Sequence, residues 1–277
     1  MSITALDLEN VLALFTQKTG IIPRESHKQS IRNFVEKRIA SLSPAGISYA
    51  GYLNANKDEL SLFINESTVN ETYFFREQAQ FDFLKNSFFP EWISKNGAKP
   101  LSAWCAASSR GEEPYSLALV AKASHVSCKI TASDINTAAL EYCRNGIYKK
   151  NSLREFDGQK YMTLLSPFQK SDGTIVLTED VKQTLTVKPL NLIELADEAT
   201  AVNFPKEQSL IFMRNVFIYF SRELKQKILR NLCKLCLAPG GILLFSISEI
   251  ASVDAEITPK ELKKMCSGSV FYFRKEE

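Results

Sequence analysis

The sequence has few of the residues from which metal and redox sites are built. Its 277 residues include only two histidines, His27 and His125, and neither has sequence neighbours that suggest a metal site or a catalytic triad. The six cysteines are scattered, and the one CxxC, Cys233 and Cys236, lies within a helical apolar pattern. Zinc or redox chemistry needs a second pair or a different loop context. We therefore expect core cysteines and predict no metal centre.

Long apolar runs and a large excess of one charge are also missing. The longest apolar stretch, 235–247, is interrupted by a Pro-Gly-Gly turn and is too short to span a bilayer. The N-terminus carries Asp7 and Glu9 instead of a basic segment before an apolar run, so no signal peptide is visible. A net charge of +3 does not demand a nucleic acid or a membrane surface as partner. These absences predict a cytoplasmic protein that binds no nucleic acid and inserts into no membrane.

Glycine is scarce where the pattern suggests a nucleotide loop. Leu101–Trp104 reads as a buried strand, 105–109 is a run of small residues, and a helix begins just after Gly111. A strand, a tight loop and a helix N-terminus form the usual cradle for a nucleotide-like ligand in an α/β sheet. Because the loop lacks a full GxGxxG, a strand–loop–helix unit without a ligand stays open as an alternative.

Two further strands end in polar residues that suit the same cradle. The next strand along the chain ends in Asp134, where an acidic side chain commonly accepts hydrogen bonds from both ribose hydroxyls. Asp134 could instead cap the helix that follows it. A later buried strand ends in Arg214 and Asn215, at the edge where open α/β sheets bind ligands.

The first part of the chain reads as helices only. Apolar residues recur at helical spacing between Leu8 and Ile64, which predicts several short helices. Between Lys18 and Arg38 there are six cations and two anions, so the second helix has a basic side. This side is either a solvated face or a docking patch for an acidic protein surface.

The pattern changes again in the middle and at the end of the chain. Short β-like stretches at 174–177 and 183–188 predict a small antiparallel insertion at about 150–188. Near the end, a short helix at 259–265 is expected before a last strand at 270–273. A final strand that returns antiparallel into a parallel sheet is typical of methyltransferases that use S-adenosylmethionine (SAM).

One aromatic motif does not look like a simple surface loop. Tyr73, Phe74 and Phe75 are bracketed by polar residues, among them Thr72 and Arg76. Packed aromatic rings would hold such a polar edge rigidly, and a guanidinium there could bind a carboxylate through two hydrogen bonds.

Together these pieces resemble the CheR-type chemotaxis receptor methyltransferases. The resemblance covers roughly Asn70 to Phe273. It rests on motifs that occur in order: NETYFFRE (70–77), WCAASSRGEEPYSLAL (104–119), ASDIN (132–136), RNGIY (144–148), NL (191–192), MRNVFIYF (213–220) and APGGILLF (238–245).

The resemblance implies an α/β, Rossmann-like SAM-dependent methyltransferase. Its mixed sheet would have an antiparallel C-terminal strand and the small β insertion, and it would span 69–277 after an all-helical docking domain at 1–68. The implied activity is methylation of glutamate side chains on chemoreceptors, which gives methyl esters and S-adenosylhomocysteine (SAH). Arg76 and Tyr219 would lie closest to the methyl transfer. The residues that would surround SAM are Asn70, Thr72, Arg76, Glu113, Asp134, Asn191, Leu192, Arg214 and Asn215.

The resemblance also implies partners. The basic helix would dock on the helical cytoplasmic domain of chemoreceptors, and the β insertion could hold a receptor C-terminal tail by strand addition. Nothing in the sequence suggests an obligate dimer, so we expect a monomer. The chain departs from the family pattern at Glu71, Arg110 and Ile247, of which Arg110 could alter cofactor affinity. Two other functions stay open: a SAM-dependent enzyme with another substrate, and a non-catalytic adaptor that binds SAM or SAH.

Overall fold

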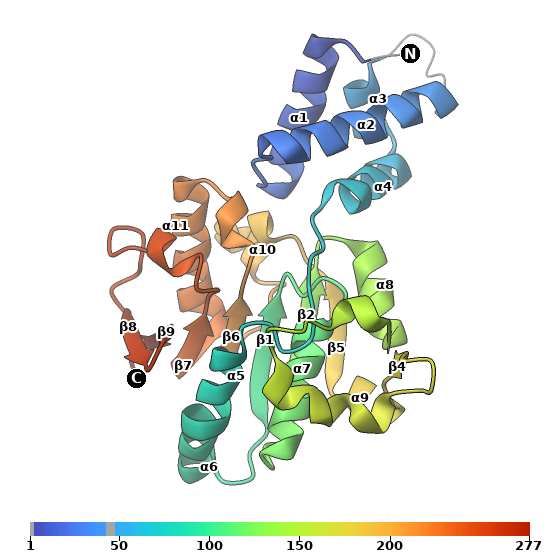
Figure 1. Ribbon diagram of the computed structural model, residues 1–277. Helices are drawn as coiled ribbons and strands as arrows, with labels where there is room; N and C mark the ends of the chain where they lie inside the picture. Colours follow the sequence, from blue (N-terminus) through green and yellow to red (C-terminus); the bar gives the residue numbers. More distant parts are fainter. Residues whose placement is uncertain (1–2, 43–47) are drawn as a thin grey trace.

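A helical unit and a larger α/β domain make up the molecule (Figure 1). The computed structural model describes residues 3–42 and 48–277. The helical unit contains α1 (Ala5–Thr19), α2 (Glu25–Leu42), α3 (Tyr49–Ala55) and α4 (Lys57–Ser67). The helices expected from apolar spacing are therefore present, and the chain then crosses into the larger domain.

The helical unit has its own core and a buried ion pair. Val11, Phe15 and other apolar residues of all four helices form a separate hydrophobic cluster. At its edge Arg38 donates to both oxygens of Glu59, at 2.8 and 2.6 Å, and the Tyr49 hydroxyl donates to the same carboxylate at 2.6 Å. Glu59 is buried, so these bonds tie α2, α3 and α4 together.

Seven strands form one mixed sheet in the order β5-β2-β1-β6-β7-β9-β8. The first five are parallel, and β9 returns antiparallel to β7. This confirms the predicted antiparallel return of the last strand. The strands are β1 (Leu101–Ala106), β2 (Cys128–Asp134), β5 (Leu185–Pro189), β6 (Gln208–Met213), β7 (Leu237–Leu244), β8 (Leu262–Ser267) and β9 (Val270–Lys275).

Two local expectations were wrong. The helix expected at 259–265 is largely strand β8, because these residues pair with β9 over six residue pairs and that pairing outweighs local helix propensity. The stretch 183–188 does not belong to the insertion, because β5 pairs in parallel with β2 at the edge of the main sheet. The small antiparallel sheet exists, but it consists of β3 (Ile147–Tyr148) and β4 (Ile175–Val176).

Helices cover both faces of the sheet. On one face lie α5 (Gln78–Phe83), which continues through a π-helical turn into α6 (Phe89–Asn96), and α7 (Glu112–Ala123). On the other lies α11 (Arg222–Asn231), which also continues through a π-helical turn. The short remaining helices are α8 (Thr137–Asn145), α9 (Glu179–Lys182) and α10 (Glu198–Ala201).

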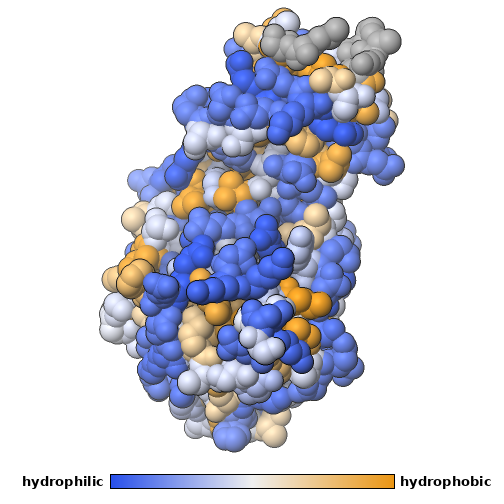
Figure 2. All heavy atoms as spheres, turned by 45° about the vertical axis from the view of Figure 1, so that its right-hand side comes forward, coloured by the Kyte–Doolittle hydropathy of each residue, from blue (hydrophilic) through white to orange (hydrophobic). Residues whose placement is uncertain are grey.

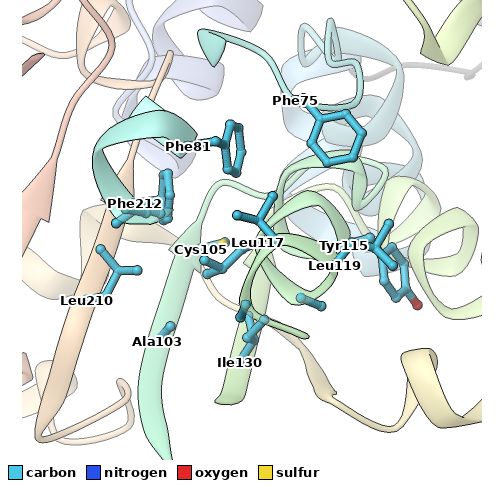
Figure 3. Packing of buried hydrophobic residues seen from close by; sticks show 14 of the residues in the cluster. Phe75, Phe81, Ala103, Cys105, Tyr115, Leu117, Leu119, Ile130, Leu210 and Phe212 are labelled. Atoms are coloured by element: carbon cyan, nitrogen blue, oxygen red, sulfur yellow. The ribbon is translucent and has the colours of Figure 1, made fainter. Parts of the chain in front are cut away.

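The strand β1 shows how the two cores arise. Its side chains alternate, so Ala103 and Cys105 join the cluster under α5 and α7, whereas Trp104 joins the cluster under α11. Figure 3 shows the first cluster, in which the rings of Phe81 and Phe212 stack with centroids 6.2 Å apart. Cys233 and Cys236 are buried in the second cluster and free, as predicted for core residues.

Candidate functional site

The loop after β1 turns sharply and needs its one glycine. Ala107, Ser109 and Gly111 all have positive φ, and that of Gly111 is 97°. A Cβ on Gly111 would lie 2.5 Å from the Sγ of Cys143 and 2.9 Å from the hydroxyl of Tyr148. Only glycine fits this close approach without strain. At the other two positions with positive φ, alanine and serine adopt the left-handed conformation, so the rest of the loop does not depend on glycine.

Asp134 holds that loop in place. One carboxylate oxygen accepts from the backbone N–H of Ser109 at 2.7 Å, and the other accepts from the N–H of Asn136 at 2.8 Å. Burial raises the pKa of this carboxyl. The alternative role as cap of the next helix was wrong, because the Asn136 side chain caps α8 by accepting from Ala139 N at 2.8 Å.

The aromatic motif is core on one side and polar on the other. Phe74 and Phe75 are fully buried, and the Phe75 N–H donates to the Ser116 hydroxyl at 2.8 Å. Asp157, from the segment that contains the insertion, accepts from the Tyr73 hydroxyl at 3.0 Å and from Glu77 N at 2.7 Å. The insertion thus fixes the backbone that presents Arg76.

Arg214 is buried at the centre of the site. Its guanidinium donates to a Glu113 oxygen at 3.1 Å and to the Arg76 carbonyl at 2.6 Å, and it lies 3.6 Å from the Glu77 carboxylate. Burial raises the pKa of Glu113 to about 7, against the partly compensating charge of Arg214. Arg214 therefore links Glu113, in the first turn of α7, to Arg76 and Glu77 of the aromatic motif.

Sequence reasoning missed the buried carboxylate of Glu249. It accepts from the backbone N–H of Asn215 at 2.7 Å, from Ile218 N at 3.2 Å and from the Ser246 hydroxyl at 2.7 Å. These bonds shape the turn that carries Tyr219. The only available signal in the sequence was its place two residues after Ile247, at which the chain departs from the family pattern.

Tyr219 is half-buried at the end of that turn. Burial raises the pKa of its hydroxyl, so the group stays protonated and can donate a hydrogen bond at neutral pH. Its carbonyl accepts from Ile22 N at 2.9 Å, which fixes the turn against the helical unit.

A cavity that is partly open to solvent lies at the carboxyl ends of the parallel strands. All the residues predicted for the site contribute to its wall: Asn70, Thr72, Arg76, Glu113, Asp134, Asn191, Leu192, Arg214, Asn215 and Tyr219. Arg110 and Ile247 do not line it; the Arg110 guanidinium instead lies 5.4 Å from the ring centroid of Tyr142. The wall includes Ser108 of the predicted loop and also residues that the sequence did not indicate, among them Thr19, Ile21, His27 and Ile135.

Four residues of this wall have a buried polar atom with no hydrogen-bond partner among residues 3–42 and 48–277. The atoms are the Nδ1 of His27, the hydroxyl of Ser108, one carboxylate oxygen of Glu113 and the Nε of Arg214. Buried polar groups are nearly always paired, so these atoms suit a polar ligand in the cavity. Together with Asp134, they fit the hydroxyl, amino and ring groups of an amino-acid nucleoside such as SAM.

Within residues 3–42 and 48–277, no group of three or more His, Cys, Asp or Glu side chains is placed to hold a metal ion. Over the same ranges, no helix is both long enough and apolar enough to cross a bilayer.

The fold and this site are those of a SAM-dependent methyltransferase, and comparison with known proteins names the family. The family described as "CheR methyltransferase, SAM binding domain" matches residues 70–265, so the chain belongs to it. A chemotaxis protein methyltransferase of Vibrio parahaemolyticus is 30% identical over 267 residues, covering 91% of each chain. One of Escherichia coli is 30% identical over 260 residues, covering 90% of this chain and 86% of that protein.

Solved structures give a more distant likeness. The magnesium protoporphyrin IX methyltransferase from Synechocystis, solved with bound SAM, aligns with 80% of this chain and 97% of its own at 11% identity and a TM-score of 0.37.

Proposed function

We propose that this chain transfers the methyl group of SAM to glutamate carboxylates of chemoreceptors, giving glutamyl methyl esters and SAH. The family membership and the names of the relatives, chemotaxis protein methyltransferases, support the reaction and the substrate class. The observation that carries the proposal is that the wall of one cavity contains every residue expected from the family motifs.

The cavity wall suggests how the cofactor is held. Asp134 has lone pairs left over for the ribose hydroxyls, since each of its oxygens accepts only one backbone bond. Asn191 and Leu192 lie beyond the end of the neighbouring strand β5 and would border the base. The unpaired oxygen of Glu113 would accept from the amino group of the methionine part. Asn70, Thr72 and Asn215 complete the polar lining.

The chemistry asks little of acid–base catalysis. Bound SAM supplies a methyl group on a positively charged sulfur. A glutamate side chain, with a pKa near 4.3, is already ionised at neutral pH and needs no general base. One carboxylate oxygen bonds to the methyl carbon as the carbon–sulfur bond breaks, and the two opposite charges disappear. The protein has to orient and desolvate the two partners, which can contribute about 7–11 kcal/mol.

Arg76 and Tyr219 are the side chains that we assign to the substrate carboxylate. Tyr219 donates a hydrogen bond that orients it, and Arg76 supplies positive charge beside it. Arg76 is restrained for this role by a 2.9 Å bond to the Glu71 carbonyl and by the Tyr73 ring, whose centroid lies 5.5 Å from its guanidinium. Arg214 is assigned a positioning role, because its two terminal nitrogens donate to Glu113 and to the Arg76 carbonyl.

The basic side of the helical unit is the proposed receptor contact. Hydrophilic residues cover most of the face of this unit seen in Figure 2. Of its six cations, Arg38 is committed to Glu59, so docking would rest on the others. Arg24 and Lys37 are exposed and suit an acidic helical surface.

The insertion offers a receptor tail only a short strand edge. Strand addition needs an exposed edge, and β3 and β4 pair over only two residues each. We therefore assign receptor docking mainly to α2. We also expect a monomeric enzyme, which light scattering would test.

The test uses labelled SAM and membranes that contain chemoreceptors. We expect base-labile methyl incorporation, as a methyl ester requires. Binding of SAH without any transfer would instead favour an adaptor, and transfer only to other proteins or to small molecules would favour a different substrate. Charge reversal at Arg24 and Lys37 should lower transfer to receptors and leave SAH affinity unchanged, with Lys95 on α6 as the control position.

A further inference from the structure

The helical unit forms part of the cavity itself. Thr19, Ile21 and His27 all line it, although they precede the matched family region. The unit is bonded to the larger domain beside the cavity. The Asn191 side chain donates to the Lys18 carbonyl at 2.7 Å, and the Asn136 side chain donates to the Asn65 carbonyl at 2.8 Å. These bonds hold the wall of α1 and α2 against the strand ends.

His27 lines this cavity and has one ring nitrogen that is free to accept a hydrogen bond. Its Nε2 is hydrogen-bonded to the backbone carbonyl of Ser67. A carbonyl can only accept, so Nε2 carries the hydrogen and Nδ1 of the neutral ring carries a lone pair. That Nδ1 is buried and has no partner in the part of the chain that the structure describes. The ring is fixed further by an edge-on contact with Phe15, with centroids 5.7 Å apart.

The position of His27 selects one end of the cofactor. Its partner Ser67 is followed by Thr68, whose hydroxyl accepts from the Asn136 side chain at 2.7 Å. Asn136 lies just beyond Asp134, at the end of β2 and beside the edge strand β5. Tyr219 lies beyond the end of β6, which is two strands away from β2 in the sheet. His27 therefore lies at the nucleoside end of the cavity. The ribose hydroxyls face Asp134 in the proposed arrangement, which leaves the base as the group near His27.

We propose that the Nδ1 of His27 accepts a hydrogen bond from the exocyclic amino group of the cofactor's adenine. This inference rests on the proposed SAM binding. The helical unit is then a part of the cofactor site. His27 would select adenine over bases that have no amino group at the same ring position. Because His27 lies on α2, the same helix would carry cofactor recognition and the basic face proposed for the receptor.

The test is a calorimetric cycle with two ligands and three variants. The ligands are SAH and its 6-deamino analogue, in which purine replaces adenine. Wild type should bind SAH about 3- to 10-fold more tightly than the analogue, as expected for one neutral hydrogen bond. His27→Phe should lose that preference and bind both ligands equally. His27→Gln, whose amide can donate to Ser67 and accept from the ligand, should keep most of it, and His125→Asn is the matched control outside the cavity.

The outcomes separate this inference from the proposed function. Equal weakening of both ligands in His27→Phe would overturn it, because the loss would then come from packing. An unchanged preference for SAH in that variant would also overturn it. If His27→Phe does not fold, a wild-type protein that binds the two ligands equally well overturns it by itself. Failure of the wild type to bind SAH at all would refute the proposed function instead.

Discussion

The affinity for SAH should depend on pH through Glu113. This carboxyl is buried beside Arg214 in the cavity wall, and one of its oxygens has no hydrogen-bond partner among the described residues. Burial raises its pKa to about 7, so a large share of the free enzyme carries a neutral Glu113 at neutral pH. The ammonium group of SAH needs the ionised form. Binding therefore has to release a proton, and affinity should rise as the pH rises.

The size of the effect follows from the pKa. With a value of about 7, the ionised share is about 10% at pH 6 and about 90% at pH 8, so the affinity should rise about tenfold between them. Titration calorimetry at pH 6, 7 and 8, in buffers of different ionisation enthalpy, measures both the affinity and the protons released. Glu113→Gln keeps the shape but cannot titrate, so its affinity should change much less over this range.

A second consequence concerns the stability of the ligand-free protein. The folded pKa of Glu113 lies above the usual value of 4.5, so the folded state binds the proton more tightly than the unfolded state. Its contribution to stability is therefore present below about pH 4.5 and is lost as the pH rises to about 7.

The affinity prediction has two outcomes that would refute it. One is the same affinity of the wild type for SAH at pH 6 and pH 8, and the other is a pH dependence that Glu113→Gln retains in full.

Three other substitutions test separate parts of the site. Tyr219→Phe should lower kcat about 10- to 100-fold, as for a lost hydrogen bond to a charged group, with SAH affinity kept; full kcat would exclude the hydroxyl from catalysis. Gly111→Ala should destabilise the fold by at least about 1–3 kcal/mol in urea unfolding and weaken SAH binding, because the residue has positive φ and no room for a Cβ. Glu249→Gln places an amide N–H group against the backbone N–H groups that now donate to the carboxylate, and it should lower the free energy of unfolding by about 1–3 kcal/mol. An unchanged urea denaturation midpoint would contradict the role of Glu249 in supporting the turn.

Most of the sheet could be predicted because its signals are local. Buried apolar runs and polar residues at their ends located β1, β2 and β6, and their order along the chain implied a parallel sheet. The stretches that became β5 and β8 were misassigned because pairing partners decide their place. The sequence of β5 is compatible with an antiparallel hairpin as well as with the parallel edge that it occupies.

The site residues were found by motif, and their partners were not. The motifs named Arg76, Glu113 and Arg214, but they gave no indication that Arg214 binds the Arg76 carbonyl or that Glu249 supports the turn before Tyr219. Such contacts join residues far apart in the chain. They depend on where the elements pack, which no local pattern contains.

The sequence alone determined the family, the cofactor class and the strands β1, β2 and β6, since these depend on short motifs and on apolar runs within single elements. The tertiary structure decided what each polar group can do. A histidine without sequence partners became a cavity residue because its ring bonds to the carbonyl of Ser67, at the end of α4 and next to the cavity-lining Thr68. Glu113, which the sequence showed only near a helix N-terminus, titrates near neutral pH because folding buries it beside one arginine and leaves one oxygen free.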